Sequence, residues 1–141
     1  MHVRIIFSPS SVTYVIESQN SSARQVMPRL PARFRKSLGP TRPSIMIAKS
    51  NRQLTLFAGS SPLRQYPVAI GKPSTPTPSG NYAIATKIVK PGGVLGTRWM
   101  GLNYDAYGIH GTNSPWLIGK MVSNGCIRMH NHNAEELFSL I

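Results

Sequence analysis

Glycine and proline divide this chain into short segments, and this division constrains the fold more than any other feature of the sequence. The 141 residues include 12 glycines and 12 prolines. Apolar and β-branched side chains recur at every second position from Tyr82 to Ile88, and Pro91–Gly93 then end the run. A period of two is typical of a strand, and frequent breakers favour turns between short strands. With 40% hydrophobic residues, we expect one mainly β domain with one core.

Other short apolar runs fit the same organisation. Residues 45–48, 53–58 and 63–70 are separated by polar turns, and residues 97–102 precede the segment that holds the cysteine. Runs of this length between turn formers predict strands, and the first three predict a β-meander.

A single short helix is expected at the end of the chain, over residues 134–140. Asn131 or Asn133 is placed to cap it, and Glu135 and Glu136 would lie in its first turn, where carboxylates suit the positive helix end. We therefore expect a structural role for the two glutamates rather than a catalytic one.

The first 43 residues have a different character. Residues 3–7 and 12–16 are short apolar runs that could form strands, but neither is long enough for a signal-peptide core or a membrane span. Residues 19–43 are rich in serine, arginine and proline and show little periodicity. We therefore predict a poorly ordered basic arm over residues 1–43 and a folded domain over residues 44–141, with no visible signal peptide or transmembrane segment.

The net charge of +12 is the most unusual bulk property of the chain. Residues 1–42 carry seven Lys or Arg and one acid, and residues 43–141 carry nine and three, so each part contributes +6. A basic surface favours polyanions such as nucleic acid, anionic lipid or the anionic polymers of a cell wall. Basic motifs interleaved with aromatic residues are absent from the sequence, so nucleic acid is not an expected partner.

The chemistry of the chain is concentrated between Tyr107 and Met129, which hold Cys126, the only cysteine. A free thiol has a pKa of about 8.5 and needs a base or a cation to become a nucleophile at neutral pH. His110 is the natural base, because a neutral imidazole can take the thiol proton and later return it to a leaving amine. Asp105 alone among the four carboxylates lies near His110 in sequence, and we prefer the backbone carbonyl of Gly111 as the group that orients the imidazole.

Two residues around Cys126 have expected supporting roles. Gly125 lets the backbone approach a substrate carbonyl, so the amides of Gly125 and Cys126 could hold a developing oxyanion. Arg128 projects to the same face as Cys126 if the segment is extended, and it could clamp a carboxylate or tune the thiolate.

Two other interpretations of the cysteine compete with catalysis. A lone cysteine is usually a small apolar core residue. Zinc could also bind a cluster of Cys126, His130 and His132, with His110 added. The spacing of these residues fits no common structural zinc pattern, so no metal site is expected.

An ordered set of motifs resembles the catalytic domain of the YkuD-type L,D-transpeptidases. The signature of that family is His-Gly, a spacer, and Ser-x-Gly-Cys-(Ile/Val)-Arg, which is matched here by His110–Gly111 and Ser123–Arg128, with Tyr107–Ile109 leading in. The resemblance extends upstream through residues 70–80 and 91–100 and covers roughly residues 44–141.

The resemblance implies a β-sandwich with one short C-terminal helix that acts as a cysteine peptidyltransferase on peptidoglycan stem peptides. Cys126 would form a thioester, His110 would serve as general acid and base, and water could replace the acceptor to give L,D-carboxypeptidase activity. It further implies a site without metal or organic cofactor, acylation by carbapenems, a monomer, and a location in the bacterial cell wall outside the cytoplasm. The implied site consists of Cys126, His110 and Gly111, with Ser123, Asn124, Gly125, Arg128 and Tyr107 around the substrate.

The chain departs from the family pattern in two places. Many members have histidine where this chain has Asn124, so a role for an imidazole at that position is not expected. The family also continues past the helix to a final strand, whereas this chain stops at Ile141. We therefore expect an unpaired sheet edge, which residues 3–7 or 12–16 could cover. The rival function is a non-catalytic cell-wall or polyanion-binding protein on the same fold.

Overall fold

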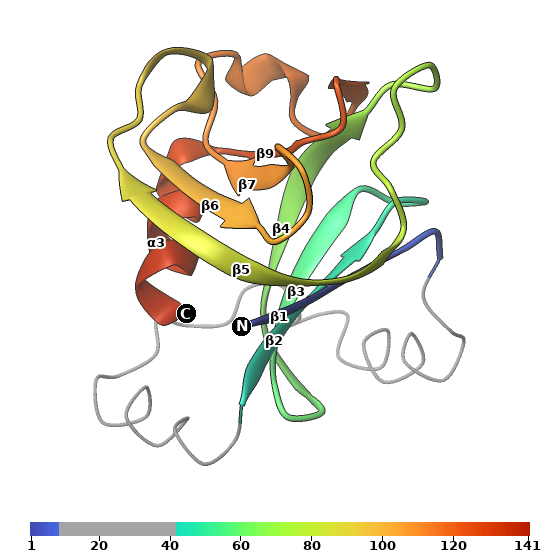
Figure 1. The fold of residues 1–141 in the computed structure, drawn as a ribbon, viewed down its shortest axis with the longest axis vertical. Coiled ribbons are helices and arrows are strands. Elements are labelled where there is room, and N and C mark those ends of the chain that lie inside the picture. The colour runs from blue at the N-terminus through green and yellow to red at the C-terminus, as the bar shows by residue number, and fades with distance from the viewer. Residues whose placement is uncertain (9–41) are drawn as a thin grey trace.

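The computed structural model describes residues 1–8 and 42–141 (Figure 1). In this part of the chain, nine strands, two 3-10 turns and one helix follow one another. The strands are β1 His2–Ile6, β2 Pro43–Ala48, β3 Gln53–Ala58, β4 Ser61–Gly71, β5 Gly80–Val89, β6 Arg98–Leu102, β7 Gly108–His110, β8 Met121–Ser123 and β9 Ile127–Met129. The 3-10 turns are η1 Gly93–Leu95 and η2 Pro115–Leu117, and the helix is α3 Asn131–Leu140.

The strands form one sheet that closes on itself. Their order is β3-β2-β1-β5-β6-β7-β9-β4-β8, and an additional pairing joins β3 to β4. The circuit from β3 round to β4 is therefore complete, with β8 attached to β4. Helix α3 packs against β6 and β7, at the left of Figure 1 behind β5. The prediction of a mainly β domain with one short C-terminal helix is confirmed.

The core lies inside this closed sheet. It is built from aliphatic side chains of almost every strand together with Leu137 of α3. Strands β3 and β5 occupy the runs predicted for residues 53–58 and 82–89. The side chains of β3 are mostly buried, whereas none of β5 is, so the alternation from Tyr82 to Ile88 marks a strand but not a buried one.

Strand β1 differs from the predicted basic arm. His2–Ile6 pair in parallel with Ser44–Ala48 of β2, and His2–Ile5 pair antiparallel with Gly80–Ala83 of β5. The side chains of Val3 and Ile5 are 0% and 1% exposed. Burial of these two side chains and pairing on both sides make the segment part of the domain. The alternative expectation that residues 3–7 supply a strand is therefore confirmed, and the expected open edge is not found in the described circuit.

Predictions for the remainder of the arm, including the run at 12–16, fall on residues 9–41 and lie outside the described residues.

The start of α3 also differs from the prediction. The helix begins at Asn131, its N-cap residue is His130, and the cap makes no side-chain hydrogen bond. Glu135 and Glu136 consequently lie beyond the first turn. Glu135 accepts a hydrogen bond from Thr97 Oγ1 at 2.8 Å. Glu136 accepts one from Tyr66 Oη at 2.6 Å and forms an ion pair with buried Arg64 at 3.4 Å. The glutamates are thus structural, but they tie the helix to the sheet rather than stabilise its positive end.

Candidate active site

The register of two neighbouring strands brings the predicted base and nucleophile to one face of the sheet. Strands β7 and β9 are parallel, with Ile109 opposite Ile127 and His110 opposite Arg128. Both isoleucines are fully buried in the core, so the residues that flank them point the other way. His110 and Arg128 therefore share a face, and Cys126, which directly precedes β9, is placed on it by the same alternation.

His110 is held in a defined orientation. It is 3% exposed, and Trp99 of the neighbouring strand β6 stacks on it with ring centroids 5.6 Å apart and planes at 25°. Its Nδ1 lies 2.5 Å from the carbonyl oxygen of Gly111. A carbonyl can only accept, so this hydrogen bond requires a proton on Nδ1 and leaves Nε2 as the acceptor. The geometry matches the expectation that the carbonyl of Gly111 contacts the imidazole.

Burial keeps the imidazole neutral. It lowers the pKa of His110 to about 4, the hydrogen bond to Gly111 partly opposes this effect, and the charge of Arg128 lowers the pKa further. Near pH 7 the ring is therefore an unprotonated base.

The thiol is also neutral at rest. Burial raises the pKa of Cys126, while a backbone hydrogen bond with Gly108 and the charge of Arg128 lower it. Sγ lies 3.7 Å from the carbonyl oxygen of Ala106. A half-buried, protonated thiol on the same face as a neutral imidazole can react only if the proton moves during the attack, so the arrangement suits general-base activation rather than a standing thiolate.

The turn that carries the cysteine, Ser123–Cys126, is called the nucleophile loop below. Ser123 Oγ donates a hydrogen bond to the carbonyl oxygen of Cys126 at 2.6 Å and accepts one from the amide of Gly125 at 3.0 Å. Ser123 is 1% exposed. The expected substrate contact for Ser123 therefore does not fit the structure, and the amide of Gly125, expected in an oxyanion site, already has an acceptor.

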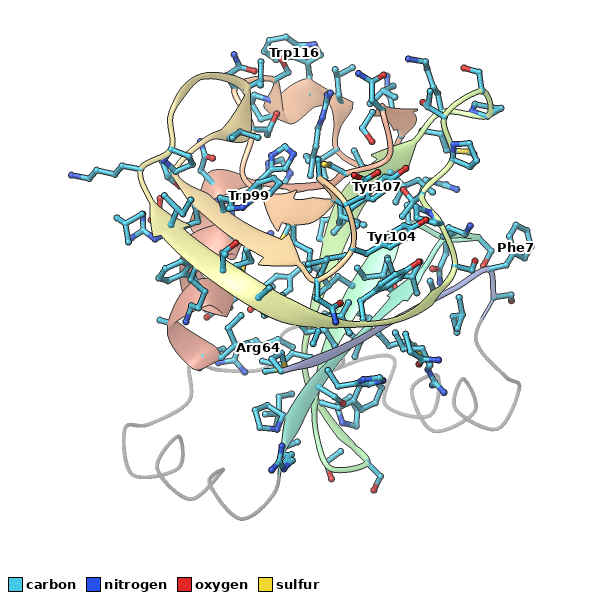
Figure 2. The ribbon with its side chains drawn as sticks, viewed as in Figure 1. Phe7, Arg64, Trp99, Tyr104, Tyr107 and Trp116 are labelled. Atoms are coloured by element: carbon cyan, nitrogen blue, oxygen red, sulfur yellow. The ribbon has the colours of Figure 1, made fainter. Side chains whose placement is uncertain are left out.

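Glycine is required at position 125. Its φ is +122°, and a Cβ atom would lie 2.4 Å from the ring of Tyr107. Tyr107 in turn stacks on Tyr104 with centroids 5.6 Å apart and planes at 6° (Figure 2). Tyr107 therefore forms a wall of the nucleophile loop.

Sequence reasoning missed the residues that support this loop. Residues 72–79, called the bracing loop below, reach it through a backbone hydrogen bond from the amide of Lys72 to the carbonyl of Ser123 at 3.0 Å and through three side-chain hydrogen bonds. They run from Lys72 Nζ to Asn124 Oδ1 at 2.9 Å, from Thr75 Oγ1 to the carbonyl of Ser123 at 2.9 Å, and from Thr77 Oγ1 to the carbonyl of Gly125 at 2.8 Å. The cluster of Thr and Pro at residues 75–78 was the available signal, but hydrogen bonds over a sequence separation of 48 to 52 residues leave no local pattern.

The prediction that Asn131 caps α3 was wrong. Its Oδ1 instead accepts hydrogen bonds from the amides of Thr112 at 3.0 Å and Thr97 at 3.2 Å. A Cβ atom on Gly111 would lie 2.1 Å from the same oxygen. Asn131 therefore ties the start of the helix to the end of the strand that carries His110.

The zinc hypothesis finds no geometric support. Among residues 1–8 and 42–141, no group of three His, Cys, Asp or Glu side chains comes close enough to hold a metal ion. His130 and His132 stack on each other with centroids 5.6 Å apart. In the same ranges, no helix is long and apolar enough to cross a membrane.

A histidine at the end of one strand and a cysteine directly before the adjacent strand define a candidate acyl-transfer site. Comparison with known protein families shows that the YkuD family, the L,D-transpeptidase catalytic domain, matches residues 42–141. The chain belongs to this family.

Two relatives carry the name "Putative L,D-transpeptidase YkuD", one from Bacillus licheniformis and one from Bacillus subtilis. Each is 44% identical to this chain over 97 residues, which is 69% of this chain and 59% of the relative. The match thus spans less than two thirds of these relatives.

Solved structures support the fold. L,D-transpeptidase 3 from Mycobacterium tuberculosis superposes with a TM-score of 0.63 at 16% identity, covering 72% of this chain and 58% of that one. The catalytic domain of the L,D-transpeptidase from E. faecium gives 0.61 at 22% identity, covering 69% and 88%.

Proposed function

We propose that the protein is a cysteine-dependent L,D-transpeptidase that forms peptidoglycan cross-links. Cys126 attacks the carbonyl at the L-centre of the third residue of a tetrapeptide stem, a thioester forms, and the terminal D-alanine leaves as the free amine. An amine of a second stem then attacks the thioester and releases the thiol. If water attacks instead, the result is L,D-carboxypeptidase activity. The parallel register of β7 and β9, with His110 opposite Arg128, is the observation that carries this proposal.

His110 moves the proton in both half-reactions. Nε2 accepts the thiol proton as the carbon–sulfur bond forms and delivers it to the leaving amine. The low pKa of His110 and the raised pKa of Cys126 make this transfer unfavourable before attack. The resting site therefore protects the thiol, and substrate binding promotes its reaction.

Arg128 affects both reacting groups. Its charge lowers the pKa of the imidazole and of the thiol, so it opposes the imidazolium and favours the thiolate. On this proposal Arg128 holds a substrate carboxylate, while Tyr107 and Asn124 line the approach to Cys126. The amide of Cys126 holds the oxyanion, joined by that of Gly125 if its bond to Ser123 opens.

The same proposal includes the cellular setting. Donor and acceptor are peptidoglycan stem peptides, so the protein acts at the cell wall outside the cytoplasm. The charge of +12 suits anionic wall polymers. We propose that the domain acts as a monomer, without nucleic acid and without a metal or organic cofactor.

Intact-protein mass spectrometry after incubation with a carbapenem tests the proposal. We expect one adduct on Cys126, lost in Cys126→Ala and formed orders of magnitude more slowly in His110→Ala. His132→Ala is the matched control, because His132 is exposed and lies on α3, and it should react like the wild type. EDTA should not change the rate. A folded wild-type protein that binds cell-wall material but forms no adduct would favour the rival, non-catalytic function.

A further inference from the structure

A pocket of about 320 Å³ lies against the bracing loop. Neither Cys126 nor His110 lines it. Its walls come from the end of β1, the turn between β2 and β3, the end of β4, the bracing loop and β8. It is therefore separate from the proposed catalytic groups.

Part of the lining is apolar and open to solvent. The side chains of Phe7 and Met121 are 70% and 46% exposed. Ile70, which also lines the pocket, is only 2% exposed and belongs to the core. Large apolar side chains left exposed around a concave surface are typical of a binding site. The pocket can therefore accept an apolar group.

The polar part of the lining is cationic. Lys49 Nζ donates to the carbonyl oxygen of Thr77 at 2.7 Å, and Arg52 Nε donates to that of Gly119 at 2.6 Å. These bonds fix both groups but use only some of their donors, because an ammonium has three N–H groups and a guanidinium has five. None of the lining residues in the described chain is acidic. The remaining donors are thus available to an anion.

We propose that this pocket binds a small amphiphilic anion, a carboxylate carried on a short apolar body. The carboxylate contacts Lys49 and Arg52, and the apolar body packs between Phe7, Ile70 and Met121. This chemistry occurs at the end of a short acyl chain and at the C-terminal residue of a peptide.

Occupation of the pocket should reach the nucleophile loop. Thr77 is 1% exposed, its Oγ1 donates to the carbonyl of Gly125, and its own carbonyl holds Lys49. The amide of Gly71 donates to the same Oγ1 at 2.9 Å. A carboxylate that draws Lys49 away from Thr77 therefore alters the support of the loop that carries Cys126. The pocket thus provides a route by which an anion changes the reactivity of the thiol.

Protein-observed NMR titration of the full chain tests the binding. Hexanoate should give saturable shifts at residues that line the pocket, and hexanamide should bind about tenfold more weakly because it lacks the charge. N-acetyl-leucine is the peptide-like probe. Tighter binding of N-acetyl-leucine than of hexanoate would indicate the C-terminal residue of a peptide, and the reverse order would indicate a short acyl chain. Lys49→Met should weaken hexanoate about tenfold, whereas Lys90→Met removes an equal charge outside the pocket and should have no effect.

Several results would overturn the proposal. The first is the absence of saturable shifts with hexanoate. The second is that hexanamide or inorganic phosphate binds as tightly as hexanoate. The third is that Lys49→Met and Lys90→Met lose the same amount of affinity for hexanoate. Met121→Trp, which fills the pocket from its rim while keeping both cations, should also block hexanoate. Binding is repeated in Cys126→Ala, so failure of the catalytic proposal leaves this test intact.

The link to the nucleophile loop has its own readout, the rate of alkylation of Cys126 by iodoacetamide. Saturating hexanoate should change this rate in the wild type and leave it unchanged in Met121→Trp. An unchanged rate in fully occupied wild-type protein would refute the link.

Discussion

Replacement of Ile5 by alanine tests whether β1 belongs to the domain. The Ile5 side chain is 1% exposed, and its backbone pairs with Ile47 on one side and Gly80 on the other. Three carbon atoms are lost, worth about 0.8 kcal/mol each in transfer free energy. The cavity adds to this, because strands on both sides are fixed by hydrogen bonds and cannot collapse into it, so we expect a loss of about 3–4 kcal/mol in the free energy of unfolding.

The assay is urea denaturation followed by circular dichroism, with the melting temperature as a second measure. A loss of this size should lower the melting temperature by roughly 10–20 °C. Arg4→Ala is the matched control, since Arg4 lies on the same strand with an exposed side chain, and its effect should stay within about 0.5 kcal/mol. Equal urea midpoints for the two variants would refute the placement of β1 in the core.

Three further predictions concern the candidate site. Because the pKa of His110 is lowered to about 4, the unfolded state binds more protons between about pH 6.5 and 4. The free energy of unfolding should therefore fall as the pH falls through this window, and His110→Gln should flatten that dependence; parallel slopes would contradict a buried neutral imidazole. Gly125→Ala should slow carbapenem acylation at least about tenfold, because the added methyl group clashes with Tyr107. Gly92→Ala is the control, since Gly92 also has a positive φ but faces open space, and its acylation rate should not change. Equal acylation rates for the two variants would exclude the clash. Arg128→Lys should slow acylation because lysine lacks the planar fork; wild-type kinetics would remove Arg128 from the site.

The local pattern of the sequence predicted most strands correctly. Gln53–Ala58 and Gly80–Val89 were visible because short runs of β-branched and apolar residues between turn formers are typical of strands, but the period of two from Tyr82 to Ile88 did not predict burial, since no side chain of β5 is buried. The proposed chemistry was visible too, because only one cysteine exists and a His-Gly pair precedes it. The imidazole contact with Gly111 was predictable because the two residues are adjacent in the chain.

Only the tertiary structure decided the features that depend on distant pairing. Composition predicted that residues 2–6 belong to a poorly ordered arm. In the structure they form a strand between β2 and β5, which begin more than 35 residues further along the chain. Asn131 was expected to cap its own helix but instead binds Thr97 and Thr112, and Thr77 supports Gly125 from another loop. Local propensity acts on neighbours in sequence, whereas these contacts form only because the closed sheet brings their backbone donors and acceptors into reach.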